Sequence, residues 1–289
     1  MPEADTTERP QPGGDLNRRD FVRASLGSGF AAATLPVSAQ TEVKTDAAGL
    51  VVGEVSIGVG DFKLPAYRAA PAGKAKPPVV LVVSEIFGVH AHIADVARRL
   101  AKQGYFAIAP ELFERQGDAG SYGEVGKLIA EVVNQARDAQ VMGDLDACVA
   151  WARTQGADTA KLGITGFCWG GRITWMYAAH NPALGAGVAW YGPVARAYAT
   201  GDKTAIEVAP RIRAPMLGLY GGDDSGIPNE TLDQMREVLK AAGNTRSEIV
   251  LYPDTPHAFH ADYRPSYRKE AADDGWRRCL AWFKANGIA

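Results

Sequence analysis

A run of five aliphatic residues, Val79-Val80-Leu81-Val82-Val83, contains no polar side chain that could face water. A strand of this composition is buried on both faces, as in parallel sheets that helices cover on each side. Similar strand patterns alternate with helical patterns along the chain. The sequence therefore predicts an α/β fold, with a mostly parallel, doubly wound sheet and helices on both faces. No internal repeat is visible, so we expect one domain over residues 40–289.

Periodicity, together with the glycines and prolines between the periodic segments, places the individual elements. A hairpin comes first, with Gly60-Asp61 as its turn. The predicted strands are Leu50–Val59, Phe62–Ala70, Val79–Val83, Tyr105–Ala109, Lys161–Thr165, Gly187–Trp190, Pro215–Tyr220 and Glu248–Leu251. The predicted helices are Ile93–Gln103, Ala130–Thr154, Gly170–Ala179, Asn229–Ala241 and Ala271–Lys284.

The N-terminal segment has the features of a targeting signal rather than of part of the fold. Arg18-Arg19 are followed by a weakly apolar run from Ala24 to Val37 and by the small residues Ser38-Ala39. This is the order of charge, apolar run and cleavage site in an export signal. The segment resembles a twin-arginine signal, which implies the Tat export machinery as a partner and a periplasmic or secreted bacterial protein. We therefore treat residues 1–39 as a signal peptide; a disordered tail with two arginines is the alternative.

Composition excludes several classes of protein. Lys and Arg total 31 and Asp and Glu total 33, so the net charge of −2 favours neither nucleic acid nor an anionic membrane. No stretch reaches 18 apolar residues, and we expect no membrane span. Three cysteines without a CxxC pair predict neither a disulfide scaffold nor a zinc site. We expect no metal and no cofactor, although Glu85, His90 and His92 could be drawn together as a metal site.

One cysteine lies in a pattern with a chemical meaning. The segment Gly166-Phe167-Cys168-Trp169-Gly170-Gly171 joins a predicted strand to a predicted helix. It resembles the nucleophile elbow of α/β-hydrolases, in which glycines permit a sharp turn and the central side chain is a nucleophile. The helix N-terminus would favour a thiolate at Cys168, and the Trp169 N–H would serve an oxyanion hole. The alternative is a small buried cysteine, which is how we read Cys148 and Cys279.

A nucleophile of this kind needs a histidine and an acid after it in the chain. His257 lies in a turn-rich loop after the last predicted strand, where catalytic residues are found. His260 shares that loop, and His180 ends the helix that starts at the elbow. Asp224 follows the strand 215–220 and would accept the Nδ1 hydrogen of the histidine. Its neighbour Asp223 is the rival, since aspartates in glycine-rich turns often only form the turn.

With these residues in place, the chain resembles the dienelactone hydrolase family of α/β-hydrolases. The resemblance extends from Val79 to the C-terminal helix. It is carried by Ser84-Glu85-Ile86-Phe87-Gly88, Ala109-Pro110-Glu111-Leu112-Phe113, Gly143-Asp144-Leu145, Gly166–Gly171, Tyr220–Pro228 and Pro256-His257-Ala258-Phe259. It implies a triad of Cys168, Asp224 and His257. It also implies that Glu85 contacts the resting thiol and helps to deprotonate it, and that the Ile86 N–H is the second oxyanion donor.

The resemblance is weakest where the substrate is bound. Family members hold the dienelactone carboxylate with two arginines, and the position of one of them is occupied here by Ala261. Arg264 and Lys127 are nearby substitutes, although each could be a surface charge, and Arg172 in the first turn of the elbow helix is a further candidate. The sequence thus predicts a hydrolase of small esters or lactones that works through a thioester at Cys168. The alternatives are a broad periplasmic esterase or thioesterase, and a catalytically silent α/β-hydrolase scaffold used for binding.

Overall fold

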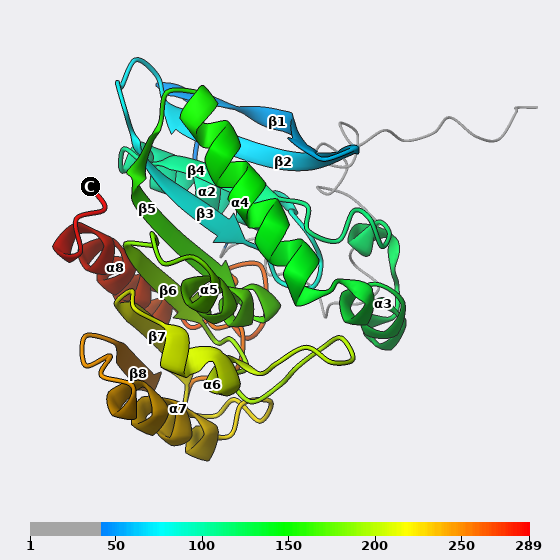
Figure 1. The fold of residues 1–289 in the computed structure, drawn as a ribbon, viewed down its shortest axis with the longest axis vertical. Helices are drawn as coiled ribbons and strands as arrows, with labels where there is room; N and C mark the ends of the chain where they lie inside the picture. The colour runs from blue at the N-terminus through cyan, green and yellow to red at the C-terminus, as the bar shows by residue number, and fades with distance from the viewer. Residues whose placement is uncertain (1–41) are drawn as a thin grey trace, which may run out of the picture.

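The computed structural model describes residues 42–289, and these residues build one eight-stranded sheet (Figure 1). Its strand order is β1-β2-β4-β3-β5-β6-β7-β8. The strands are β1 (Leu50–Val59), β2 (Phe62–Pro71), β3 (Pro78–Val83), β4 (Phe106–Pro110), β5 (Asp158–Phe167), β6 (Ala186–Trp190), β7 (Met216–Gly221) and β8 (Glu248–Tyr252). All eight predicted strands are present, with ends that differ by a few residues.

The direction of the strands divides the sheet into two parts. β1 and β2 form the predicted antiparallel hairpin, in which Gly60 takes a positive φ of 56° in the turn. β2 also runs antiparallel to β4. From β4 through β3 to β8 every pairing is parallel. The prediction of a mostly parallel sheet is confirmed, and the carboxyl ends of its central strands meet along one edge.

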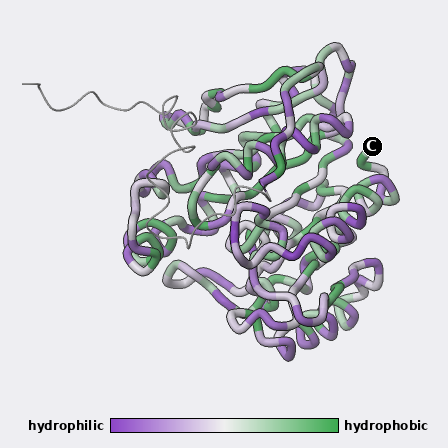
Figure 2. The backbone as a smooth tube through the Cα atoms, turned by 180° about the vertical axis from the view of Figure 1, so that it is seen from behind, coloured by the Kyte–Doolittle hydropathy of each residue, from purple (hydrophilic) through white to green (hydrophobic). Residues whose placement is uncertain are grey.

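Helices cover both faces of this sheet. They are α2 (Ala91–Lys102), α3 (Val125–Glu131), α4 (Asp138–Thr154), α5 (Trp169–His180), α6 (Ala205–Val208), α7 (Asn229–Ala241) and α8 (Lys269–Ala285), with 3₁₀ turns at Ala119–Ser121, Val133–Gln135 and Ala209–Arg211. In Figure 1, α4 and α5 lie in front of the sheet, and α2 and α8 lie behind it. Purple and green alternate along the helices in Figure 2, as expected where one side faces the core and the other faces water.

The predicted helix Ala130–Thr154 is wrong in its extent. A short helix ends at Glu131, a 3₁₀ turn follows, and α4 begins only at Asp138. Ala136 leaves helical geometry with a ψ of 94°, although no glycine or proline marks the break. The break places the Asp138 carboxylate at the start of α4, where both of its oxygens accept hydrogen bonds from Arg172 on α5. A tertiary contact therefore decides where the helix begins.

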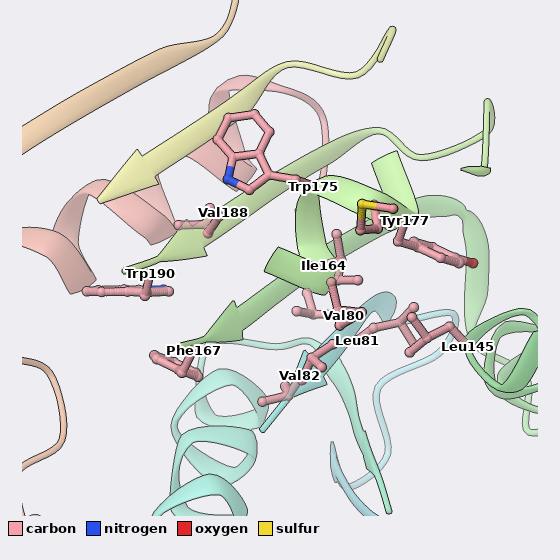
Figure 3. Packing of buried hydrophobic residues seen from close by; sticks show 14 of the residues in the cluster. Val80, Leu81, Val82, Leu145, Ile164, Phe167, Trp175, Tyr177, Val188 and Trp190 are labelled. Carbon is pink, nitrogen blue, oxygen red and sulfur yellow. The ribbon is translucent and has the colours of Figure 1, made fainter. Parts of the chain in front are cut away.

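The core lies on both faces of the central strands. All six residues of β3 are buried, as the aliphatic run predicted. Figure 3 shows Val80, Leu81 and Val82 of this strand beside side chains of β5 and β6 and of the covering helices. Trp175 of α5 and Trp190 of β6 are both fully buried there. This packing holds the strand ends, and the residues that follow them, in fixed positions.

Candidate active site

The turn between β5 and α5 is sharp and strained. β5 ends at Phe167, α5 begins at Trp169, and Cys168 alone joins them with φ 54° and ψ −117°. A positive φ is unfavourable for a residue with a side chain, and such backbone strain is concentrated at functional sites. The cysteine side chain is partly exposed, while the residues on each side of it are buried.

Glycine is required at three positions around this turn because the backbone passes so closely. A methyl group on Gly166 would overlap the carbonyl of Gly170. One on Gly170 would overlap the carbonyls of Val83 and Ser84, and one on Gly171 would meet the carbonyl of Trp190. The predicted reason for the glycines, close approach of helix and strands, agrees with these contacts.

Among the described residues, the backbone N–H groups of Ile86 and Trp169 have no acceptor. Ile86 lies just beyond the end of β3, and Trp169 is the first residue of α5. Within residues 42–289 neither amide donates a hydrogen bond to another residue, although both residues are at least nine-tenths buried. Buried amides normally find a partner, and a negatively charged oxygen would supply one. The elbow pattern indicates the Trp169 amide for an oxyanion hole, and the family resemblance implies the Ile86 amide.

His257 and an aspartate meet at the same edge of the sheet. Nδ1 of His257 lies 2.6 Å from Oδ2 of Asp224, whose side chain is 2% exposed. The other oxygen of Asp224 accepts the N–H of Gly226 at 2.9 Å. Asp223 is exposed, and no hydrogen bond joins its side chain to the histidine within residues 42–289. The geometry therefore favours Asp224 over its neighbour as the partner of His257.

His257 also reaches the elbow. Burial lowers the pKa of its imidazole, but the hydrogen bond to Asp224 and the interaction with the Cys168 side chain outweigh burial and raise the pKa to about 10. The imidazole thus joins the thiol to the buried carboxylate. The other two candidates lie elsewhere. His260 is buried against the ring of Phe167, and His180 pairs with Asp146 on the outer surface of α5.

Glu85 has a partner that sequence reasoning did not foresee. Its Oε2 lies 3.1 Å from Nε2 of His90, the residue that precedes α2, and both side chains are buried. Burial raises the pKa of the Glu85 carboxyl, but the hydrogen bond and charge of His90 outweigh burial and lower that pKa to about 2. Its other oxygen, Oε1, has no hydrogen-bond partner among residues 42–289. The position of His90 five residues after Glu85, at a helix start, was the only available signal.

The two arginine candidates differ in what they contact. Arg172 is fully buried, with both Nη atoms on Asp138 and its Nε donating to the carbonyl of Arg196 at 2.9 Å. This arrangement favours a structural role for Arg172 rather than a contact with the substrate. Arg264 lies over the ring of Phe87, and its Nη2 is buried without a partner in the described part of the chain. Of these two arginines, only Arg264 has a side-chain nitrogen without a partner among residues 42–289.

The structure offers no support for a metal centre or a membrane span within the residues that it covers. No group of three His, Cys, Asp or Glu residues in 42–289 has the geometry to hold a metal ion. No helix in the same range is long and apolar enough to cross a bilayer. The predicted signal peptide, residues 1–39, lies outside the described residues.

The strand order, the elbow and the edge that carries Asp224 and His257 define an α/β-hydrolase fold. The family model of the dienelactone hydrolase family matches residues 64–287, and the chain belongs to that family. It is a hydrolase that acts on esters or lactones.

Individual relatives agree with this assignment. A protein of Methylorubrum extorquens, provisionally named carboxymethylenebutenolidase, is 58% identical over 276 residues, which cover 95% of this chain and 94% of that protein. A provisionally named carboxymethylenebutenolidase of Escherichia coli K12 is 51% identical over 90% of this chain and 96% of its own.

Solved structures show the same fold. The crystal structure of a provisionally assigned dienelactone hydrolase from Klebsiella pneumoniae matches with a TM-score of 0.79 and 51% identity, covering 81% of this chain and 98% of that one. An acylaminoacyl peptidase of Pyrococcus horikoshii matches with a TM-score of 0.64 at 16% identity, over 82% of this chain and 42% of that one. The latter likeness concerns the fold alone.

Proposed function

We propose that the protein hydrolyses small esters or lactones with Cys168 as the nucleophile, through a thioester acyl-enzyme. One observation carries the proposal: Nδ1 of His257 lies 2.6 Å from the buried Asp224 carboxylate, and the Cys168 side chain is among the groups that raise the pKa of this imidazole. A nucleophile, a base and an acid in this order are what acyl transfer to water requires.

The proposed reaction follows from the positions of the groups. The Cys168 sulfur attacks the ester carbonyl, and the amides of Ile86 and Trp169 bind the oxygen that becomes negative. Protonated His257 gives its proton to the leaving oxygen, and the alcohol or enol departs. Neutral His257 then removes a proton from water, which attacks the thioester and frees the acid and the Cys168 thiol. Asp224 keeps the imidazole in the required tautomer throughout.

Glu85 would take part through the oxygen that His90 does not hold. That carboxylate lies beyond the end of β3, the strand next to β5, so it follows the strand neighbouring that of Cys168. In the proposed role, Oε1 accepts the proton of the resting thiol when substrate arrives and returns it to the sulfur when the thioester is cleaved.

The substrate class is proposed from the free donor beside the site. Arg264 presents an unpartnered Nη2 next to the ring of Phe87, which suits an acyl group with an apolar body and a negative or polar end. Dienelactones have this character. Because Ala261 stands where the family has an arginine, a broad esterase or thioesterase is the second candidate.

The test compares a dienelactone, p-nitrophenyl acetate and a thioester as substrates of the protein and of its Cys168→Ala variant. Turnover that the variant lacks is expected. Cys148→Ala, which changes a buried residue of α4, is the matched control and should keep activity. Unchanged turnover in Cys168→Ala would refute the nucleophile. Absence of turnover by the wild type, together with no reaction of the native thiol with iodoacetamide, would favour the silent scaffold.

We also propose that residues 1–39 direct the protein through the Tat pathway to the periplasm. The support is the order Arg18-Arg19, apolar run and Ser38-Ala39. The test is fractionation of cells that express either the full chain or its double variant Arg18→Lys, Arg19→Lys. Periplasmic protein that is lost in the variant supports the proposal, and cytoplasmic protein in both refutes it.

A further inference from the structure

Tyr191 combines two unfavourable features. It directly follows β6, and its φ is 39°, in the left-handed region that residues with side chains avoid. Its side chain is fully buried, yet the hydroxyl oxygen has no hydrogen-bond partner among residues 42–289. Burying an unpartnered hydroxyl and straining the backbone both destabilise a fold.

Other buried tyrosines in the described chain do not share this state. The Tyr220 hydroxyl accepts a hydrogen bond from Trp175 Nε1 and donates one to the carbonyl of Gly192, each at 3.0 Å. The Tyr177 hydroxyl donates to Asp146 at 2.9 Å. The fold thus gives hydrogen-bond partners to the hydroxyls of Tyr220 and Tyr177, whereas the Tyr191 hydroxyl has none among the described residues.

The hydroxyl lies beside the proposed chemistry. The carbonyl of Trp190 accepts the N–H of Cys168 at 3.0 Å, which fixes Tyr191 next to the elbow. The Tyr191 ring packs edge-on against His257, with 5.1 Å between ring centres. Burial and the charges of Glu85 and Cys168 raise the pKa of the hydroxyl well above its ordinary value. It therefore remains protonated and can donate.

We propose that Tyr191 is a further catalytic residue whose hydroxyl donates a hydrogen bond to an oxygen of the reacting ester group. The inference rests on the proposed hydrolase function. Ile86 follows β3 and Tyr191 follows β6, the two strands that flank β5, so the donors approach Cys168 from opposite sides. The acceptor is either the carbonyl oxygen, beside the two amides, or the alkoxy oxygen, beside His257.

The variant Tyr191→Phe removes only the hydroxyl and keeps the ring contacts with His257 and Phe259. We expect kcat/KM for esters to fall about tenfold or more, in line with the loss of one transition-state donor. The melting temperature should stay equal or rise. The matched control, Tyr220→Phe, removes a satisfied hydroxyl, so its melting temperature should fall while kcat/KM is retained.

The leaving group distinguishes the two acceptors. A loss that is larger for ethyl than for p-nitrophenyl esters indicates the alkoxy oxygen, and equal losses indicate the carbonyl oxygen; either supports the proposal. Wild-type kcat/KM in Tyr191→Phe overturns it. A parallel fall in the rate of Cys168 alkylation by iodoacetamide also overturns it, because the hydroxyl would then act on the thiol. Failure of the hydrolase function itself would be visible as absence of ester turnover by the wild type, and failure of the proposed nucleophile as turnover that survives Cys168→Ala.

Discussion

Nδ1 of His257 lies 2.6 Å from Oδ2 of Asp224, although 33 residues separate them in the sequence. The two residues follow β7 and β8, which are parallel neighbours in the sheet. Parallel pairing brings the loops after both strands to one edge, where the nucleophile turn after β5 also lies. The sheet, rather than either loop, sets this contact.

Asp224→Asn should lower kcat/KM by about a thousandfold, because an amide cannot hold the imidazole in the reactive tautomer. Asp223→Asn, which changes an exposed neighbour, should leave kcat/KM within a few-fold of wild type. Steady-state kinetics on one ester decides between them. A damaging Asp223 change beside a harmless Asp224 change would contradict the observed pairing.

The protonation of His257 makes stability depend on alkaline pH. Its folded pKa of about 10 is above the ordinary 6.5. Its contribution to stability is therefore complete at or below pH 6.5 and is lost as pH rises through 10. The urea midpoint of unfolding should fall further between pH 6 and pH 10 in the wild type than in His257→Gln. Equal falls in both proteins would show that other groups cause the alkaline loss.

His90 keeps Glu85 ionised in the buried site. The folded pKa of Glu85, about 2, is below the ordinary 4.5, so its stabilisation is present above pH 4.5 and is lost as pH falls through 2. His90→Leu removes one partner of a buried pair and should cost about 3–5 kcal/mol at pH 7.

His90→Gln, which retains an N–H donor, is the control and should lose less. In His90→Leu the deficit should shrink between pH 7 and pH 4, because the buried Glu85 carboxyl has lost its hydrogen-bond partner and takes up a proton more readily. Urea unfolding across that range measures it. A deficit that is independent of pH would mean that His90 acts through packing alone.

Substitution of Arg264 should affect substrate binding, whereas substitution of Arg172 should affect the stability of the fold. Arg264→Met should raise KM for anionic esters several-fold and leave KM for neutral esters nearly unchanged, because it removes the unpartnered donor. Arg172→Met breaks the buried pair with Asp138 and should cost about 3–5 kcal/mol of stability. Kinetics with paired neutral and anionic substrates, and urea unfolding, test both. An anionic substrate that depends on Arg172 alone would reverse the assignment.

Substitution by alanine should lower the stability of the protein at an elbow glycine and raise it at a helix glycine. Gly171→Ala places a methyl group against the carbonyl of Trp190 and should destabilise the protein severely. Gly143→Ala, on an exposed position of α4 with nothing near it, should add about 0.5–1 kcal/mol of stability. Thermal unfolding of the two variants is the measurement. A stable Gly171→Ala protein would show that helix and strands can move apart at the elbow.

Much of the fold could be predicted because its signals are local. The aliphatic run 79–83 marks a strand buried on both faces, and Gly60-Asp61 marks a hairpin turn. The start of α4 could not be predicted, since no glycine or proline interrupts the pattern there. It depends on the contact of Asp138 with Arg172, which are 34 residues apart in the sequence.

The class of the sheet, the elbow at Cys168 and the residues most suited to acid and base chemistry could be predicted from the sequence alone. These follow from periodicity, from glycine spacing and from the position of residues after strands, all of which are properties of short segments. Which polar or charged side chains pair with each other could be learned only from the tertiary structure. It placed Asp224 rather than Asp223 on His257, His90 on Glu85 and Arg172 on Asp138. Burial makes such pairings obligatory, and only packing determines which groups are buried together.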